Sequence, residues 1–300
     1  LSLRRQRQMC IRDRGDTIPP AWAMGASGQA FRTTVADSLS EYGPAELDLK
    51  EVLPLLGNLG REIRLISAEP GDPDFRQRQK EVWEAVRESI DRGVPAVAKV
   101  GPFFWLVRGY HPEDKVYYFS AFMPQLEEPL EADGLGEDGG LVVLFFGRRT
   151  RVDTTRVVRE SLEFALREAR WKAPEGAKYF RGLEALKKWA QMLEDGRMVP
   201  GFGPGYTAMV TSEARRFASV YLKEVAPRFR GDAAEALRKA ARLYREEARK
   251  LGEVRRIFPL HREPATLSPE DLRRAAQLVR EAGELEERAV EAIGRALEEM

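Results

Sequence analysis

The spacing of apolar residues changes near residues 147–155, and this change constrains the fold more than any other feature of the chain. Before it, short apolar runs such as Leu141–Phe146 have the length and composition of β-strands. After it, apolar residues recur every three or four positions, as on one face of an α-helix. A chain of 300 residues with this pattern is expected to form an α+β protein of two domains, 15–150 and 151–300.

The first of these domains combines helices with strands. Short helices are predicted over 48–59 and 74–92, the second ending at Gly93. The segment Met24–Phe31 is rich in glycine and is expected to turn tightly or pack closely. Strands are predicted over 61–67, 95–100, 103–110, 115–122 and 141–146. His-Pro-Glu-Asp between the third and fourth of these strands has the composition of a hairpin turn.

The second domain is predicted to be a bundle of five amphipathic helices. The predicted helices cover 153–170, a stripe from Tyr179 to Leu193, 210–225, a segment opening at Asp232, and Ser268 to the C-terminus. GFGPGY (201–206) is interpreted as a break before the third helix. Asp232 with Glu235 predicts a capping box, and Ser268-Pro269 predicts an N-cap followed by a proline in the first turn.

Residues 1–14 differ from the rest of the chain. The string RRQRQMCIRDR resembles a translated sequencing adapter of the kind found at the ends of metagenomic reading frames, and it has no hydrophobic period. We interpret it as a non-native scar, with the genuine N-terminus missing, and exclude it from fold reasoning. Cys10, the single cysteine, is therefore not expected to be a nucleophile.

Composition excludes several classes of protein. One cysteine cannot form a disulfide framework, and His111 and His261 are too far apart for a zinc motif, so no metal or cofactor is expected. The 49 basic and 48 acidic residues give no sign of nucleic-acid binding. The glycine-rich segments match no phosphate-binding motif. No apolar run has the length of a membrane helix, so a cytoplasmic protein of unknown oligomeric state is expected.

Aromatic residues are dense between positions 103 and 122. Core packing explains them most simply, because alternate residues of adjacent strands face the core. The alternative is that some line an apolar pocket for an acyl or aromatic ligand. The chain offers Phe103, Trp105 and Tyr110 for either role, with His111 in the turn that follows.

Several segments together resemble a bacterial family. They are MGASGQAFR (24–32), GVPAVAKVGPFFWLVRGYHPEDKVYYF (93–119), KYFRGLEALKKWAQMLEDGR (178–197) and GFGPGYTAMVTSEARRFASVYLKEVA (201–226). Their order is similar to that in proteins with a butirosin biosynthesis protein H-like N-terminal domain and a helical C-terminal domain. The resemblance implies a papain-like fold, N-terminally truncated here, related to acyltransferases that use a carrier protein and to cysteine peptidases.

The chemistry of that fold requires a Cys thiolate at the head of a helix, a His that takes its proton, and a polar group that orients the His. The resemblance places the Cys upstream of residue 24, where the adapter-like residues lie. It places the His at the start of the strand that ends in Gly-Tyr, where this chain has Phe103. The orienting Asp would lie near residues 119–121, which contain none.

Three interpretations remain open. The chain is a pseudoenzyme that binds a small molecule or an acyl-carrier protein, or its full-length parent is an active thiol acyltransferase or hydrolase, or it is a structural interaction protein. Arg32 is expected either in a surface salt bridge or in recognition of an anion or an acyl carrier. No catalytic residue is assigned. The candidate pocket residues are Gly25, Ser27, Gly28, Phe31, Arg32, Phe103, Trp105, Tyr110 and His111.

Overall fold

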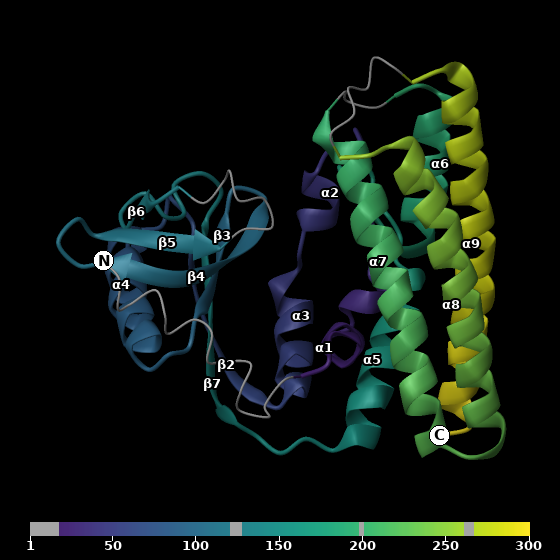
Figure 1. The fold of residues 1–300 in the computed structure, drawn as a ribbon, viewed down its shortest axis with the longest axis horizontal. Helices are drawn as coiled ribbons and strands as arrows, with labels where there is room; N and C mark the ends of the chain where they lie inside the picture. Colours follow the sequence, from purple (N-terminus) through teal and green to yellow (C-terminus); the bar gives the residue numbers. More distant parts are fainter. Residues whose placement is uncertain (1–17, 121–127, 198–200, 261–266) are drawn as a thin grey trace. The chain divides into compact units, whose positions relative to one another are not determined.

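The computed structural model describes residues 18–120, 128–197, 201–260 and 267–300, and the predicted α+β class is confirmed (Figure 1). These residues form two compact units. The sheet unit comprises Gly60–Arg151, and the helical unit combines Ile18–Leu59 with Val152–Met300. Within the described residues, no helix combines the length and the apolar character needed to cross a lipid bilayer.

The described part of the sheet unit contains helix α4 and an antiparallel sheet. In the described residues, the strands lie side by side in the order β2-β7-β3-β4-β5-β6. The hairpin predicted around His-Pro-Glu-Asp is confirmed, with His111 opposite Val116. The elements are β2 (Arg61–Ala68), α4 (Phe75–Asp91), β3 (Ala96–Val100), β4 (Phe103–His111), β5 (Val116–Ser120), β6 (Leu130–Glu131) and β7 (Leu141–Arg149).

Helix α4 covers one face of this sheet. Its residues Val82, Trp83 and Val86 recur at helical spacing, so that one stripe faces the strands. They pack in one core with Trp105 of β4 and Phe119 of β5. Trp105, Tyr117 and Phe119 of the aromatic run therefore contribute to the core of the sheet unit, and Phe122 lies outside the described residues.

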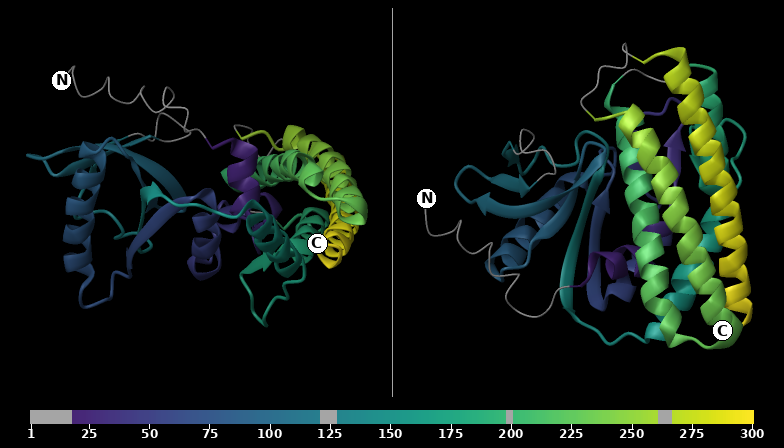
Figure 2. Two further views of the ribbon diagram at one scale, coloured as in Figure 1. Left: turned by 90° about the horizontal axis from the view of Figure 1, so that it is seen from below. Right: turned by 45° about the vertical axis from the view of Figure 1, so that its right-hand side comes forward.

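The helical unit is built around long helices that run side by side (Figure 2). Helix α8 packs between α7 and α9, and α9 also contacts α5 and α6. The α-helices are α1 (Pro20–Ala26), α2 (Tyr42–Ala45), α3 (Leu49–Leu56), α5 (Thr154–Ala169), α6 (Gly182–Glu194), α7 (Phe202–Val225), α8 (Gly231–Ile257) and α9 (Pro269–Glu298). Shorter elements are η2 (Gln29–Phe31), β1 (Thr34–Ala36), η3 (Gly57–Leu59), β8 (Tyr179–Arg181) and η5 (Ala226–Arg228).

Residues 18–59 belong to the helical unit, whereas the sequence analysis assigned them to the first domain. Phe31 lies in the core that α7, α8 and α9 share, and Val35 and Leu39 lie in the second core of the same unit. Strand β1 pairs with β8 in antiparallel register. The boundary at residue 151 has a sequence signal, the change of period, but the boundary at Gly60 has none, because long-range packing decides it.

Two predictions about glycine and tyrosine segments need correction. GFGPGY, predicted to break the chain, forms the start of α7, because a proline in the first helical turn removes no helical hydrogen bond. Gly203 lies against the carbonyl of Leu39, where a Cβ would be 2.3 Å from that oxygen. Tyr179, predicted to open a helix, lies instead in β8.

Of the two helix caps predicted from the sequence, the one at Ser268 is confirmed and the one at Asp232 is not. The Ser268 hydroxyl accepts from the Asp271 amide at 3.1 Å, and the Asp271 carboxylate accepts from the Ser268 amide, so the predicted N-cap is confirmed. The capping box predicted at Asp232 is wrong, because α8 has Arg230 at its N-cap and Asp232 lies inside the first turn. Asp232 is still placed where a carboxylate stabilises the positive end of the helix dipole.

Candidate functional site

The glycine-rich segment 24–32 lies within the helical core, and the expected tight packing is confirmed. A Cβ on Gly25 would lie 2.1 Å from the Tyr221 ring, so only glycine fits there. Gly28 has a φ of 76° and faces Phe164, where a Cβ would lie 2.5 Å from the ring. The Ser27 hydroxyl donates to the Ala23 carbonyl at 2.6 Å. The segment therefore fixes its own backbone against two aromatic rings.

Phe31 and Arg32 extend this segment toward the centre of the helical unit. The Phe31 ring is buried between those of Tyr221 and Tyr244, with centroids 6.2 and 5.8 Å away. Arg32 is partly buried, and its Nη1 lies 3.4 Å from the Gln29 Oε1. Burial lowers the pKa of Arg32, and the carboxylate of Glu168 acts against that shift.

Arg32 was expected either in a surface salt bridge or in recognition of an anion or an acyl carrier. Within the described residues, Arg32 forms no ion pair, so the expected surface salt bridge is not found there. The nearby Glu168 and Glu51 both pair with Arg181 instead. The Arg32 carbonyl accepts a hydrogen bond from Nη1 of Arg215 at 3.2 Å, so its backbone is part of a buried network.

That network centres on Arg215 of α7, which the sequence analysis did not single out. Its guanidinium is completely buried, and Nε lies 2.9 Å from Oε1 of Glu247 on α8 and 2.5 Å from Oε2 of Glu286 on α9. It also donates to the Ala30 carbonyl and to the Thr33 hydroxyl. The Arg215 side chain thus links α7, α8 and α9 to η2 and to the residues that follow it.

The cluster contains one positively charged group, Arg215, and two buried carboxyl groups, those of Glu247 and Glu286. If both carboxyl groups were ionised, the negative charge would exceed the positive charge. Burial raises the pKa of Glu247 well above its ordinary value, the adjacent Glu286 adds to the shift, and Arg215 acts against it. Burial alone would lower the pKa of Arg215, but the two carboxylates outweigh burial and raise it. Burial and the neighbouring carboxyl group therefore favour the protonated form of Glu247, whereas the guanidinium of Arg215 stays charged.

A sequence signal for this cluster does exist. Arg215 lies on the buried stripe of α7, four residues after Thr211 and three residues before Ala218. Glu247 and Glu286 likewise occupy buried positions of α8 and α9. A charge on an apolar stripe is expected to have a buried partner, since an unpaired buried charge is strongly unfavourable. Which helices supply the partners depends on tertiary packing.

The remaining candidates lie on β4 of the sheet unit. Trp105 is buried against Phe119, with ring centroids 6.4 Å apart. The Tyr110 hydroxyl donates to the Asp91 carboxylate at 3.0 Å, and its ring contacts Trp83 edge-on. Phe103 is partly exposed at the start of the strand. Trp105 thus packs against β5 and Tyr110 against α4, and Phe103 packs at the edge of the same core.

His111 ends β4 and belongs to the turn. Its side chain is 41% exposed, and Nδ1 accepts from the Asp114 amide at 3.3 Å. His261 and Cys10 lie outside the described residues. Within the described part of the chain, no group of three His, Cys, Asp or Glu residues could hold a metal ion.

The structure thus divides the candidate residues between two units. Gly25, Ser27, Gly28, Phe31 and Arg32 lie in the helical unit, and Phe103, Trp105, Tyr110 and His111 lie on one strand of the sheet unit. No protein-family model matches the chain, and a comparison with curated proteins gives no significant match.

Proposed function

We propose that this chain is a non-catalytic member of the butirosin biosynthesis protein H-like family, with a papain-like fold, and that it acts in the cytoplasm by binding a ligand or a partner. The order of the segments 24–32, 93–119, 178–197 and 201–226 supports the family assignment. The α+β architecture supports the proposed fold only at the level of class, because the described residues contain both helices and an antiparallel sheet.

The observation that carries the proposal is the position of Phe103. In the related peptidases a His opens the strand that ends in Gly-Tyr, and here Phe103 opens β4, which continues through Gly109 and Tyr110. His111 lies at the opposite end of the same strand, roughly 25 Å away at about 3.3 Å per residue. An imidazole there cannot take the place of one at position 103, because a general base must lie within hydrogen-bonding reach of its nucleophile.

The glycine-rich segment gives the helical unit a rigid backbone, which favours binding of a ligand or a partner. Its Gly25 and Gly28 contacts and the buried hydrogen bonds of Arg215 hold the backbone of residues 25–33 in one conformation. A rigid scaffold lowers the entropy lost on binding. A small molecule or an acyl-carrier protein is the partner that the family resemblance implies.

Covalent labelling tests this proposal. The chain is incubated with an acyl thioester, and acylation is followed by intact mass with a Cys10→Ser variant as control. We expect Cys10 to react no faster than free cysteine, and at the same rate in His111→Ala and His261→Ala variants. Fast acylation that is lost in the Cys10 variant and in either histidine variant would show thiol catalysis and contradict the proposal.

A thiol-dependent acyltransferase or hydrolase is the alternative for a longer parent protein. It requires a Cys at the head of a helix upstream of residue 24. The same labelling applied to the parent protein distinguishes the two functions: acylation of such a Cys would identify an active enzyme, and unreactive protein would leave a binding protein.

A further inference from the structure

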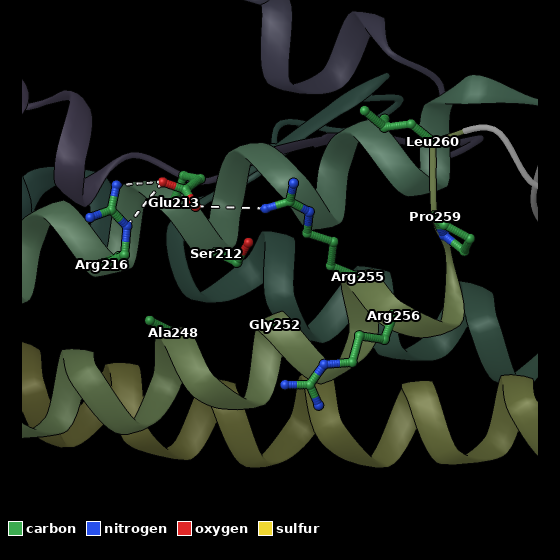
Figure 3. Close-up of a pocket in the computed structure, with 9 residues that line it drawn as sticks. All are labelled: Ser212, Glu213, Arg216, Ala248, Gly252, Arg255, Arg256, Pro259 and Leu260. Atoms are coloured by element: carbon green, nitrogen blue, oxygen red, sulfur yellow. Dashed lines mark hydrogen bonds and ion pairs between the residues drawn. The ribbon is translucent and has the colours of Figure 1, made fainter.

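A groove on the helical unit carries an excess of positive charge. It lies between α7 and α8 and the residues that follow α8, and its volume is about 740 Å³ (Figure 3). Arg216 comes from α7, and Arg255 and Arg256 come from the last turn of α8. Glu213 is the one acidic residue among those that line it. The charged side chains lining the groove therefore carry a net charge of about +2.

Glu213 organises two of the three guanidinium groups. Its Oε2 accepts from Nη2 of Arg216 at 2.7 Å and from Nε at 3.0 Å, and its Oε1 lies 3.6 Å from Nη1 of Arg255. In Figure 3 these two arginines approach Glu213 from opposite sides, and Arg256 extends away from the pair. No ion pair of Arg256 occurs among the residues the structure describes, so its charge is not offset by a neighbouring carboxylate.

Other arginines of α8 are paired differently. Arg249, which does not line the groove, has Glu253 at 2.9 Å and Glu246 at 3.5 Å. Such pairs along a helix are common on solvated faces. Arg255 and Arg256 lie in the last turn, where the negative end of the helix dipole stabilises adjacent positive charges. The helix dipole therefore accounts for two adjacent arginines at the end of α8. It does not account for Arg216 of α7, which lines the same groove.

The floor of the groove leaves room for a ligand. Ala248 and Gly252 lie one helical turn apart on α8, and both line it. A Cβ on Gly252 would meet no atom within 4 Å. Ser212, whose side chain is nearly buried, donates to the Met209 carbonyl and keeps its oxygen lone pairs as acceptors. Small-molecule sites have volumes of about 300–1,000 Å³, a range that includes this groove.

We propose that this groove binds a small phosphorylated organic molecule, with the phosphate between Arg255 and Arg256 and the uncharged part over Ala248 and Gly252. Two positive charges in excess match a phosphate dianion better than a single carboxylate. The planar guanidinium presents two parallel donors to phosphate oxygens, which makes arginine well suited to this contact. The inference goes beyond the proposed function, because the groove shares no residue with the candidate pocket.

Calorimetric titration with phenyl phosphate at low ionic strength tests this inference, with benzoate as the monoanionic comparison. We expect phenyl phosphate to bind, benzoate to bind more weakly, and Arg256→Gln to weaken phenyl phosphate binding about tenfold, the equivalent of one charge-assisted hydrogen bond. Gly252→Leu is expected to fill the groove and abolish binding, and the open space at this position allows the variant to fold. Arg249→Gln, on the same helix outside the groove, is the matched control and leaves the affinity unchanged.

Three outcomes would overturn the inference. They are no heat of binding with phenyl phosphate, equal affinity for benzoate, and affinity that survives both Arg256→Gln and Gly252→Leu. Far-ultraviolet circular dichroism of each variant confirms that it is folded, so that lost binding is assigned to the groove.

Discussion

Nε of Arg215 lies 2.9 Å from Oε1 of Glu247, and neither side chain is exposed to solvent. This hydrogen-bonded contact joins α7 to α8 inside the helical unit, and Glu286 of α9 approaches the same guanidinium. Removing one partner of a buried ion pair is strongly destabilising, because the remaining charge is left without compensation. The stability of the helical unit should therefore depend on Arg215 far more than on any exposed arginine.

Replacing Arg215 tests this dependence. Arg215→Met leaves two buried carboxyl groups without a counter-charge, and we expect it to lower the free energy of unfolding by about 3–5 kcal/mol. Arg216→Met is the matched control, since that side chain is 55% exposed and pairs with Glu213 at the surface, where such pairs contribute about 0–1 kcal/mol. Urea denaturation measures both. Equal losses for the two variants would contradict a buried role for Arg215.

The carboxyl group of Glu247 should make stability depend on pH. Burial, together with the neighbouring Glu286, raises its pKa in the folded protein, whereas the unfolded chain has an ordinary glutamate pKa. The folded state therefore retains a proton that the unfolded state releases. The stabilisation is complete below the ordinary pKa and is lost as pH rises toward the folded pKa.

A glutamine at position 247 mimics the protonated carboxyl group and removes this dependence. As pH rises above the ordinary glutamate pKa, we expect the wild type to lose folding free energy relative to Glu247→Gln, by at most about 1.4 kcal/mol per pH unit. Glu246→Gln, whose side chain is 47% exposed, serves as control and should follow the wild type. Parallel pH profiles for wild type and Glu247→Gln would show that Glu247 is ionised in the folded protein.

Gly25 should not accept a side chain. Gly25→Ala places a Cβ within 2.1 Å of the Tyr221 ring, and we expect a loss of about 1–3 kcal/mol from overpacking. Gly57→Ala is the control, because nothing lies within 4 Å of the new Cβ and the backbone there is helical. The control variant should be as stable as the wild type or slightly more stable. Thermal unfolding of the two variants compares them directly, and equal midpoints would contradict the close approach of Tyr221.

The two predicted helix caps can be distinguished by mutation. Ser268→Ala removes a hydrogen-bonded N-cap and should lower the free energy of unfolding by about 1 kcal/mol. Asp232→Ala removes only a favourable charge near the start of α8, and we expect a loss of about 0.3 kcal/mol. Chemical denaturation of both variants measures the difference. A larger loss for Asp232→Ala would contradict this assignment and support Asp232 as the N-cap of α8.

Local sequence patterns predicted the elements of the fold better than their grouping into units. The strand runs and the stripe of α4 were visible because each depends on neighbouring residues. The membership of residues 18–59 was not, because the pairing of β1 with β8 and the packing of Phe31 join segments far apart in the chain. The glycines at the start of α7 suggested a break in the chain. They are needed there because Gly203 and Gly205 lie against segments that are distant in the sequence, which local patterns do not show.

The candidate site was predicted in composition but not in arrangement. The tight packing of Gly25 and Gly28 followed from their residue type. The burial of Arg215 with Glu247 and Glu286 was not predicted, because the three residues are far apart in the sequence. Only the packing of α7, α8 and α9 brings the three together.

Thiol release from an acyl thioester in the presence of an amine acceptor tests the central claim, binding without catalysis, most directly. We expect the chain to release no more thiol than the protein-free reaction does. Release of several equivalents of thiol per chain, abolished by Cys10→Ser, would show turnover and contradict the account.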